Sequence, residues 1–307
     1  MHFTATSTGL SSTTFWERHQ RVTAPWLFLA PALALFAVYV LGPIIRSIGF
    51  GFYSWDGLST PRFIGFENYL ELYGDPNFWI AFKNNFIWLV CFLLAVPAGL
   101  LFSLLLNQNI FGMRAVKSLF FFPFVISQAV VGLMFGWFYD PSNGLLFHVL
   151  HWFGITPVAV LSDERYVTYG IVAAGLYPQI SYCMILYVTG LSNVRSDLIE
   201  AARLEGAHGW RMLWSIVLPQ LRSATFVAIV VTVVGALRSF DMVSIMTQGG
   251  PYGSSRVLAY YMYEQALGDY GYRVGYGSAI ATILFLVMLT YIGFVLVRVY
   301  KQEREVA

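Results

Sequence analysis

Residues 200–223 read EAARLEGAHGWRMLWSIVLPQLRS and form the longest polar segment in the second half of the chain. Asp197 can cap a helix, and Glu200 three residues later completes a capping-box-like pair. Gly206 is a natural helix end, because glycine adopts a left-handed conformation at little cost, and Pro219 marks the bend that closes the segment. A second short helix is predicted from four residues at helical spacing, Trp210, Leu213, Trp214 and Val217. Such an exposed helix–turn–helix is either an ordinary loop or a surface that another protein approaches closely.

The rest of the chain is strongly apolar. Of its 307 residues, 58% are hydrophobic and 11% are charged, whereas about a quarter of the residues of a soluble domain are charged. The sequence therefore predicts an integral membrane protein. The net charge of +2 comes from dispersed basic residues, which argues against a nucleic-acid partner. Cys91 and Cys183 lie in apolar segments, and no cluster of His, Cys, Asp or Glu predicts a metal site or a catalytic centre.

Six apolar segments are each close to the length of about 20 residues that a helix needs to cross a membrane. They are predicted at about residues 26–45, 84–106, 118–139, 168–191, 224–246 and 277–297. The predicted fold class is thus an all-α integral membrane protein with six transmembrane helices. Residues 1–24 and 301–307 are predicted as polar tails that flank a membrane domain at residues 25–300. The first apolar segment is too long for a signal-peptide core and is predicted to be an uncleaved span.

The orientation in the membrane follows from the basic residues, which concentrate in cytoplasmic loops. If both termini are cytoplasmic, the inner segments hold 11 of the 18 Lys and Arg residues. This arrangement places the loop at residues 192–222 in the cytoplasm.

Several polar side chains fall inside the predicted spans, where they are costly and usually face a bundle interior or an aqueous path. Gln128 and Gln179 lie near the middle of their spans and are interpreted as lining a path. Thr232 and Ser239 are seven residues apart and share one face of an ideal helix, where either a path for hydroxyl-rich solutes or helix packing would explain them. Arg238 and Asp241, at i and i+3, are predicted to form a structural ion pair.

The polar segment at residues 200–223 resembles the cytoplasmic EAA loop of the permease subunits of ABC importers. The resemblance rests on Glu200-Ala201-Ala202, on Glu205-Gly206-Ala207 and on Ile216-Val217-Leu218-Pro219. Three positions depart from the usual pattern: Glu205 replaces Asp, Leu213 replaces Phe and Ser223 replaces a second Pro. The resemblance implies a coupling helix held by an ATPase subunit and formed by Glu200, Ala201, Ala202, Leu204, Glu205, Gly206 and Ala207.

A second resemblance concerns residues 240–251, FDMVSIMTQGGP, and residues 276–279, YGSA. Both are similar to the ends of the fifth and sixth spans in sugar permeases of the maltose and glycerol-3-phosphate importer type. The resemblance covers roughly residues 24–300 and implies the type I ABC importer permease fold. It places the sugar site on the third, fourth and fifth spans, at Phe124, Gln128, Gly175, Gln179, Thr232, Ala236 and Ser239.

The family resemblance also implies the setting in which the chain works. The chain would be a non-catalytic transport subunit in a bacterial inner membrane, paired with a second, homologous permease as a heterodimer. ATP and magnesium would be bound by two separate ATPase subunits, and an extracytoplasmic binding protein would deliver the sugar. One alternative is a permease of the same superfamily for a polyol or a phosphodiester. The other is a stand-alone channel or secondary transporter, which would need no coupling helix.

Overall fold

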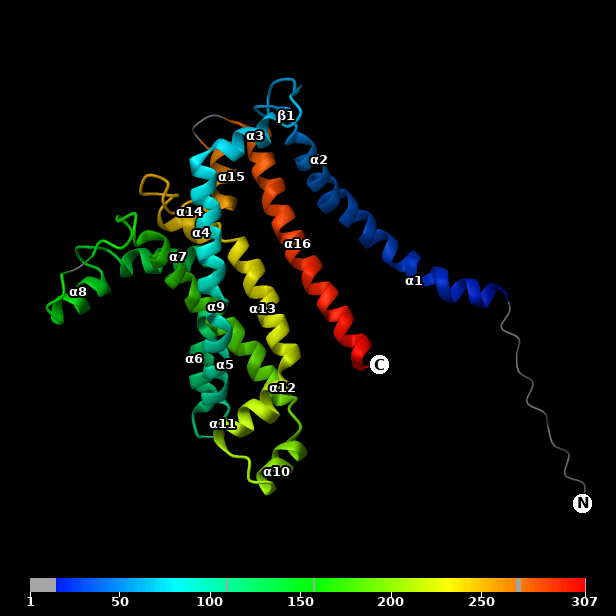
Figure 1. Ribbon diagram of the computed structural model, residues 1–307, viewed down its shortest axis with the longest axis vertical. Coiled ribbons are helices and arrows are strands. Elements are labelled where there is room, and N and C mark those ends of the chain that lie inside the picture. The colour runs from blue at the N-terminus through cyan, green and yellow to red at the C-terminus, as the bar shows by residue number, and fades with distance from the viewer. Residues whose placement is uncertain (1–14, 109, 157, 269–271, 307) are drawn as a thin grey trace, which may run out of the picture. The chain divides into compact units, whose positions relative to one another are not determined.

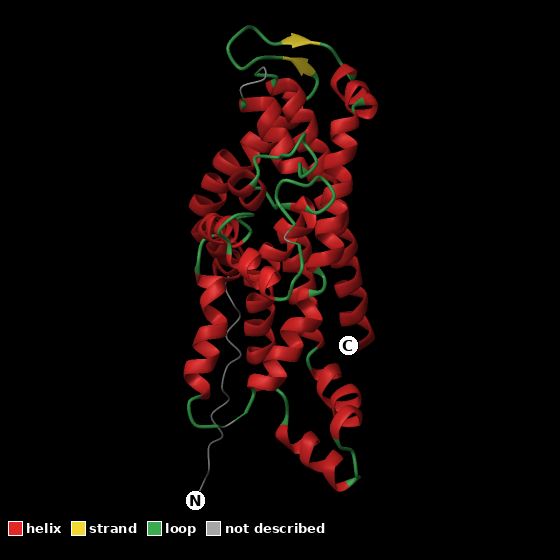
Figure 2. Cartoon of the chain, turned by 90° about the vertical axis from the view of Figure 1, so that its left-hand side faces the viewer, coloured by secondary structure: helices red, strands yellow, loops and turns green. Residues whose placement is uncertain are grey.

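The computed structural model describes the backbone of residues 15–306 except 109, 157 and 269–271, and the side chains of residues 23–298 within these limits. It consists of helices with one small hairpin (Figures 1 and 2), which confirms the predicted helical membrane class. The chain divides into two units, residues 1–49 and 50–307.

The first unit is a helical segment with an apolar surface. It contains α1 (Phe15–Phe36), a π-helical turn at Ala37–Leu41 and most of α2 (Gly42–Phe50). None of its described side chains is buried, and Phe28 is 85% exposed. We infer that this surface faces lipid. Helix α1 begins at Phe15, so residues 15–24 of the tail predicted at residues 1–24 are helical, and residues 1–14 lie outside the described part.

The second unit begins with an antiparallel hairpin of β1 (Tyr53–Ser54) and β2 (Arg62–Phe63), which the sequence analysis did not predict. Its helices are α3 (Glu67–Gly74), α4 (Pro76–Phe92), α5 (Ala95–Leu106), α6 (Met113–Val125), α7 (Gln128–Phe138), α8 (Leu145–Trp152), α9 (Val167–Ser192), α10 (Ser196–Leu204), α11 (Gly209–Met212), a π-helical turn at Leu213–Val217, α12 (Leu218–Gln220), α13 (Arg222–Leu237), α14 (Asp241–Met246), α15 (Leu258–Leu267) and α16 (Val274–Val306). The tail predicted at residues 301–307 is helical as far as Val306, as part of α16.

Four helical segments of the described chain are each long and apolar enough to cross a membrane without a sharp bend. They are Thr23–Phe50, Pro76–Leu106, Val167–Ser192 and Val274–Arg298. Two further spans are bent helix pairs: α6 with α7, at an angle of 99°, and Gly209–Gln220 with α13, at an angle of 72°. The described chain therefore has up to six spans if each bent pair counts as one.

The third predicted span, residues 118–139, is thus broken in the middle. Ile126 and Ser127 have extended backbone conformations, and the Ser127 hydroxyl accepts a hydrogen bond from Val130 N, which caps the start of α7. A serine inside an apolar window does not interrupt a hydropathy pattern, although it can start a new helix.

The fifth predicted span, residues 224–246, is also interrupted. Helix α13 ends at Leu237, and α14 starts only at Asp241. The Ser239 hydroxyl donates to the carbonyls of Ala236, at 2.7 Å, and Gly235, at 3.2 Å. The Ala236 carbonyl, at the end of the helix, thereby gains a partner, whereas the Gly235 carbonyl also accepts from Arg238 N.

Helix α9 is the centre of the second unit and packs against α4, α5, α6, α7 and α13. Three large side chains at this centre are at most 1% exposed: Trp88 of α4, and Ile171 and Tyr187 of α9. Burial of each such side chain stabilises the folded state by about 1.5–3 kcal/mol. Where α5 crosses α9, a Cβ built on Gly99 would lie 2.5 Å from the Cβ of Cys183. The two helices therefore touch through glycine.

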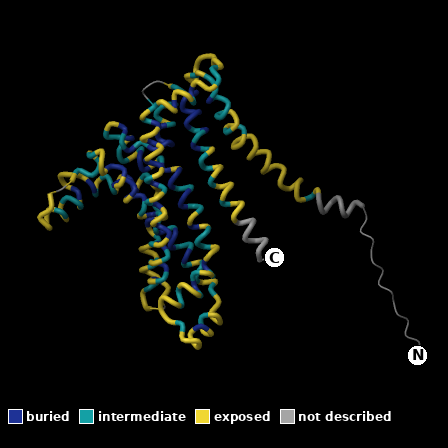
Figure 3. The backbone as a smooth tube through the Cα atoms, in the orientation of Figure 1, coloured by how far each residue is buried: buried dark blue, intermediate teal, exposed yellow. Residues whose placement is uncertain are grey.

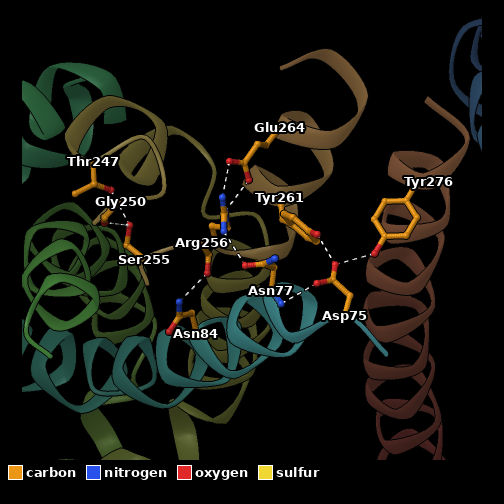
Figure 4. Close-up of polar contacts among 10 residues, drawn as sticks. All are labelled: Asp75, Asn77, Asn84, Thr247, Gly250, Ser255, Arg256, Tyr261, Glu264 and Tyr276. Atoms are coloured by element: carbon orange, nitrogen blue, oxygen red, sulfur yellow. Dashed lines mark hydrogen bonds and ion pairs between the residues drawn. The ribbon is translucent and has the colours of Figure 1, made fainter. Parts of the chain in front are cut away.

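A polar network joins the start of α4 to α15 and α16 (Figure 4). The Asp75 carboxylate caps α4 by accepting from Asn77 N, and it also accepts from the hydroxyls of Tyr261 and Tyr276. Burial raises the pKa of Asp75, but the hydrogen bonds outweigh this and hold the pKa below its usual value. Nearby, Arg256 forms a part-buried ion pair with Glu264 at 2.6 Å. This network fixes the three helix ends relative to one another.

Candidate functional site

A cavity of about 590 Å³ lies beside the breaks in the third and fifth predicted spans. Its size is within the usual range for small-molecule pockets, about 300–1,000 Å³. The lining residues come from α4, from the α6–α7 junction, from α9 and from the α13–α14 junction. The two broken helices thus contribute irregular backbone within predicted spans, which is tolerated where backbone lines a cavity.

Aromatic rings form much of the cavity wall. Phe124 of α6 lies against Tyr182 of α9, with ring centroids 5.0 Å apart, and Trp88 lies against Phe92 with centroids 4.9 Å apart. The indole N–H of Trp88 is buried and has no hydrogen-bond partner among the described residues. The wall therefore offers ring faces on which an apolar or sugar-like face can pack.

Two glutamines supply amide groups to the same cavity. Gln128 is exposed and makes no hydrogen bond among the described residues. Gln179 donates through Nε2 to Thr232 Oγ1 at 2.8 Å, and also lies 3.9 Å from Cys183 Sγ. Its Nε2 is thus held toward α13, whereas its Oε1 has no hydrogen-bond partner among the described residues. We infer that Gln179 presents an acceptor to the cavity.

Arg238 and Asp241 also line the cavity, one on each side of the gap between α13 and α14. The ion pair predicted between them is not formed: the described ion pairs join Arg195 with Asp197, Arg256 with Glu264, and Arg273 with Glu71. The prediction assumed a continuous helix, in which residues i and i+3 are neighbours. Since α13 ends at Leu237, that spacing does not apply.

Four of the seven predicted substrate residues line the cavity: Phe124, Gln128, Gln179 and Ser239. The other three lie behind its wall. Thr232 and Ala236 are 0% exposed, and a Cβ built on Gly175 would lie 3.0 Å from the rings of Trp88 and Phe92. Sequence reasoning missed Trp88, Phe92, Ser127 and Tyr182, whose aromatic or small side chains are ordinary in an apolar span.

At the other candidate site, the segment at residues 195–220 forms a turn of short helices (Figure 1), and most of its residues are exposed (Figure 3). Helix α10 carries Glu200, Ala201, Ala202 and Leu204, and Glu205, Gly206 and Ala207 follow it. Only Ala202 of these seven residues is buried. Three large apolar side chains of the turn are open: Leu204 at 91%, Trp210 at 74% and Trp214 at 66% exposed. Exposed apolar side chains that lie together can mark a contact with another protein or with the membrane surface.

The ends of α10 show how this turn is shaped. Gly206 has φ +84°, its N–H donates to the Arg203 carbonyl, and Ala207 N donates to the Ala202 carbonyl. This is the Schellman arrangement, as the predicted helix end at Gly206 requires. At the start, Asp197 does not cap the helix as predicted; it lies in the first turn and pairs with Arg195, whose guanidinium lowers the pKa of Asp197. The bend predicted near Pro219 occurs at Leu221, between α12 and α13.

Comparison with known proteins places these features among transport proteins. Residues 71–305 match the family model of the binding-protein-dependent transport system inner membrane component. The chain is 32% identical to the probable ABC transporter permease protein YurN of Bacillus subtilis, over 94% of this chain and 99% of that protein. It is 27% identical to the probable starch degradation products transport system permease protein AmyD of Thermoanaerobacterium thermosulfurigenes, over 92% and 94%. Its fold is similar to a chain of a bacterial alginate ABC transporter, solved with a periplasmic protein that holds an alginate pentasaccharide, with a TM-score of 0.78, 22% identity and coverage of 92% and 95%.

Proposed function

The chain belongs to the family of inner membrane components of binding-protein-dependent transport systems, and on this premise we propose that it is the permease subunit through which an ATP-driven importer moves a sugar or oligosaccharide. The cavity carries this proposal. It combines aromatic faces, amides and unpaired charged groups within 590 Å³, which is the chemistry that a polyhydroxylated ring needs. The names of AmyD and of the alginate transporter, both for carbohydrate cargo, agree with it.

The coupling to ATP enters at α10. Glu200 to Ala207 form the contact with an ATPase subunit, and the exposed Leu204, Trp210 and Trp214 support this assignment, since the described chain leaves them uncovered. Two ATPase subunits, as separate chains, bind ATP and magnesium, and their closure moves α10 and the spans attached to it. A second, homologous permease completes the path, and an extracytoplasmic binding protein delivers the sugar.

The orientation follows from the same assignment. With α10 in the cytoplasm, both termini are cytoplasmic, and Arg203, Arg211 and Arg222 lie on the cytoplasmic side, in keeping with the bias of basic residues toward that side. The membrane is the bacterial inner membrane. The polar network around Asp75 (Figure 4) then lies at the outer end, on the side from which the binding protein delivers the sugar.

Uptake by the reconstituted importer tests this function. The chain, its partner permease and the ATPase subunits are placed in proteoliposomes with ATP inside and the binding protein outside. Radiolabelled trehalose, raffinose, maltotriose and trigalacturonate serve as probes. We expect at least one probe to be taken up, only when both ATP and the binding protein are present, and not with a non-hydrolysable ATP analogue. Uptake without ATP would indicate a channel or a secondary transporter, and uptake of no carbohydrate would refute the proposed cargo.

Replacing Thr232 by valine tests whether the orientation of Gln179 matters for uptake. Valine has the shape of threonine but removes the hydroxyl that holds Gln179 Nε2. An amide that loses its partner costs about 1 kcal/mol, so we expect the uptake efficiency to fall about fivefold. Thr232→Ser keeps the hydroxyl and is expected to transport at close to the wild-type rate. Equal uptake by the valine and serine variants would show that this hydrogen bond does not position the amide.

A further inference from the structure

The gap between α13 and α14 places two opposite charges on the cavity wall without pairing them. Arg238 is the C-cap residue of α13, and Asp241 is the first residue of α14. Both side chains are exposed, line the cavity and make no ion pair or hydrogen bond within the described chain. The described ion pairs of the chain join other residues. Two opposite charges without protein partners in the described chain therefore line the same cavity.

The two groups have complementary hydrogen-bonding chemistry. The guanidinium of Arg238 only donates, and the ionised carboxylate of Asp241 only accepts. A sugar hydroxyl can do both, so one polyhydroxylated ligand can accept from Arg238 and donate to Asp241. The acceptor of Gln179 and the amide of Gln128 extend this set around the same cavity, and Phe124 with Tyr182 supplies a ring face.

The charges of the described cavity lining also cancel, because Arg238 and Asp241 are its only ionised side chains. An anionic ligand that reached Arg238 would meet the carboxylate of Asp241, and a cationic ligand would meet Arg238. Juxtaposed like charges in a binding site are unfavourable. The arrangement therefore disfavours ligands of either sign and suits a ligand that carries no net charge.

We propose that Arg238 and Asp241 are specificity-determining residues that select an electrically neutral polyhydroxylated solute, such as an unmodified oligosaccharide, against acidic sugars. The proposal rests on the proposed function, which it narrows from sugars in general to neutral ones. Arg238 donates to ring or hydroxyl oxygens, Asp241 accepts from hydroxyls, and each excludes ligands that bear its own sign of charge.

Equilibrium dialysis on the complete transporter in nanodiscs, without the binding protein, measures this selectivity. The probes are radiolabelled maltotriose, which is neutral, and trigalacturonate, which is acidic and of the same length. We expect wild-type transporter to bind maltotriose at least about tenfold more tightly than trigalacturonate. Asp241→Asn removes the repulsion and is expected to shift the ratio of the two affinities about tenfold toward the acid, whereas Arg238→Gln shifts it the other way.

The control variants are Glu164→Gln and Arg165→Gln, which neutralise an exposed acid and an exposed base that do not line the cavity. They are expected to leave the affinity ratio unchanged.

Three outcomes count against the proposal. The first is an affinity ratio that stays the same in Asp241→Asn and Arg238→Gln as in wild type. If these variants also assemble poorly, the two residues serve to bind the second permease. Wild-type transporter that binds trigalacturonate as well as maltotriose also overturns the proposal but leaves the sugar function standing. If the transporter takes up a sugar in proteoliposomes but binds neither probe in the dialysis, the proposed selectivity is wrong and the proposed sugar function still stands.

Discussion

Gly206→Val is expected to lower ATP-driven uptake about 10- to 100-fold while the transporter still assembles in the membrane. Gly206 ends α10 with φ +84°, a conformation that a β-branched residue adopts only under strain. A Cβ at this position would meet nothing within 4 Å, so crowding is not the cause of the effect. The strain, of the order of 1–3 kcal/mol, is relieved when the last turn of α10 unwinds.

Unwinding this turn breaks the link between the ATPase and the spans. The bonds from Gly206 N to the Arg203 carbonyl and from Ala207 N to the Ala202 carbonyl would be lost, and Leu204 would leave its exposed position. ATP hydrolysis by the assembled complex should therefore continue at the basal rate without driving uptake. Uptake and hydrolysis measured on the same proteoliposomes separate these two quantities.

Gly206→Asn is the matched control. Asparagine tolerates the left-handed conformation better than other residues that carry a side chain, so this variant should retain most of the uptake although it also adds a side chain. If the valine variant imports as fast as wild type, the shape of this turn does not matter for coupling. If both variants fail equally, the added side chain and not the backbone conformation is responsible.

Much of the fold was predictable because hydropathy and helix-ending glycines act over short distances along the chain. The apolar segments, the polar turn and its end at Gly206 all follow from neighbouring residues. The two helix breaks do not. Ser127 and Ser239 are single hydroxyls in apolar segments, and they interrupt their helices by hydrogen-bonding to backbone groups, which a hydropathy window does not detect.

Contacts between distant parts of the chain were also beyond the sequence analysis. Asn84 was predicted at the beginning of the second span, yet α4 begins at Pro76 and Asn84 is 3% exposed within it. Its amide donates to the carbonyls of Ser254 and Arg256, at 2.6 and 2.7 Å, and neighbouring Asn85 accepts from Leu258 N. These partners lie about 170 residues away along the chain. Only the folded chain shows why two asparagines are needed there.

The candidate substrate site was half predictable for a related reason. A spacing of seven residues places Thr232 and Ser239 on one face of an ideal helix. Ser239 lies beyond the end of α13, however, and so lines the cavity, whereas Thr232 is buried against α9 and bonds to Gln179. The same helix end separates Arg238 from Asp241. The end of α13 therefore explains why Ser239 does not share a face with Thr232 and why Arg238 and Asp241 are not paired.

Gly99→Ala is expected to destabilise the protein by about 3 kcal/mol, although alanine normally stabilises a helix relative to glycine by about 1 kcal/mol. The added Cβ would lie 2.5 Å from Cys183 Cβ, 2.8 Å from Met184 N and 2.9 Å from the carbonyl carbon of Cys183. Two of these atoms belong to the backbone of α9, so no side-chain rotation relieves the contact. Helices α5 and α9 must move apart along the centre of the second unit.

Gly136→Ala adds the same methyl group to another apolar helix, α7, where the new Cβ meets nothing within 4 Å. This variant is expected to raise the midpoint of thermal unfolding slightly, by the helix propensity alone, whereas Gly99→Ala lowers it by several degrees and reduces uptake. The opposite signs of the two shifts are the decisive result, because both variants differ from wild type by one methyl group. Equal midpoints would mean that α5 and α9 are not held in close contact, and the packing around α9 could not then position the cavity.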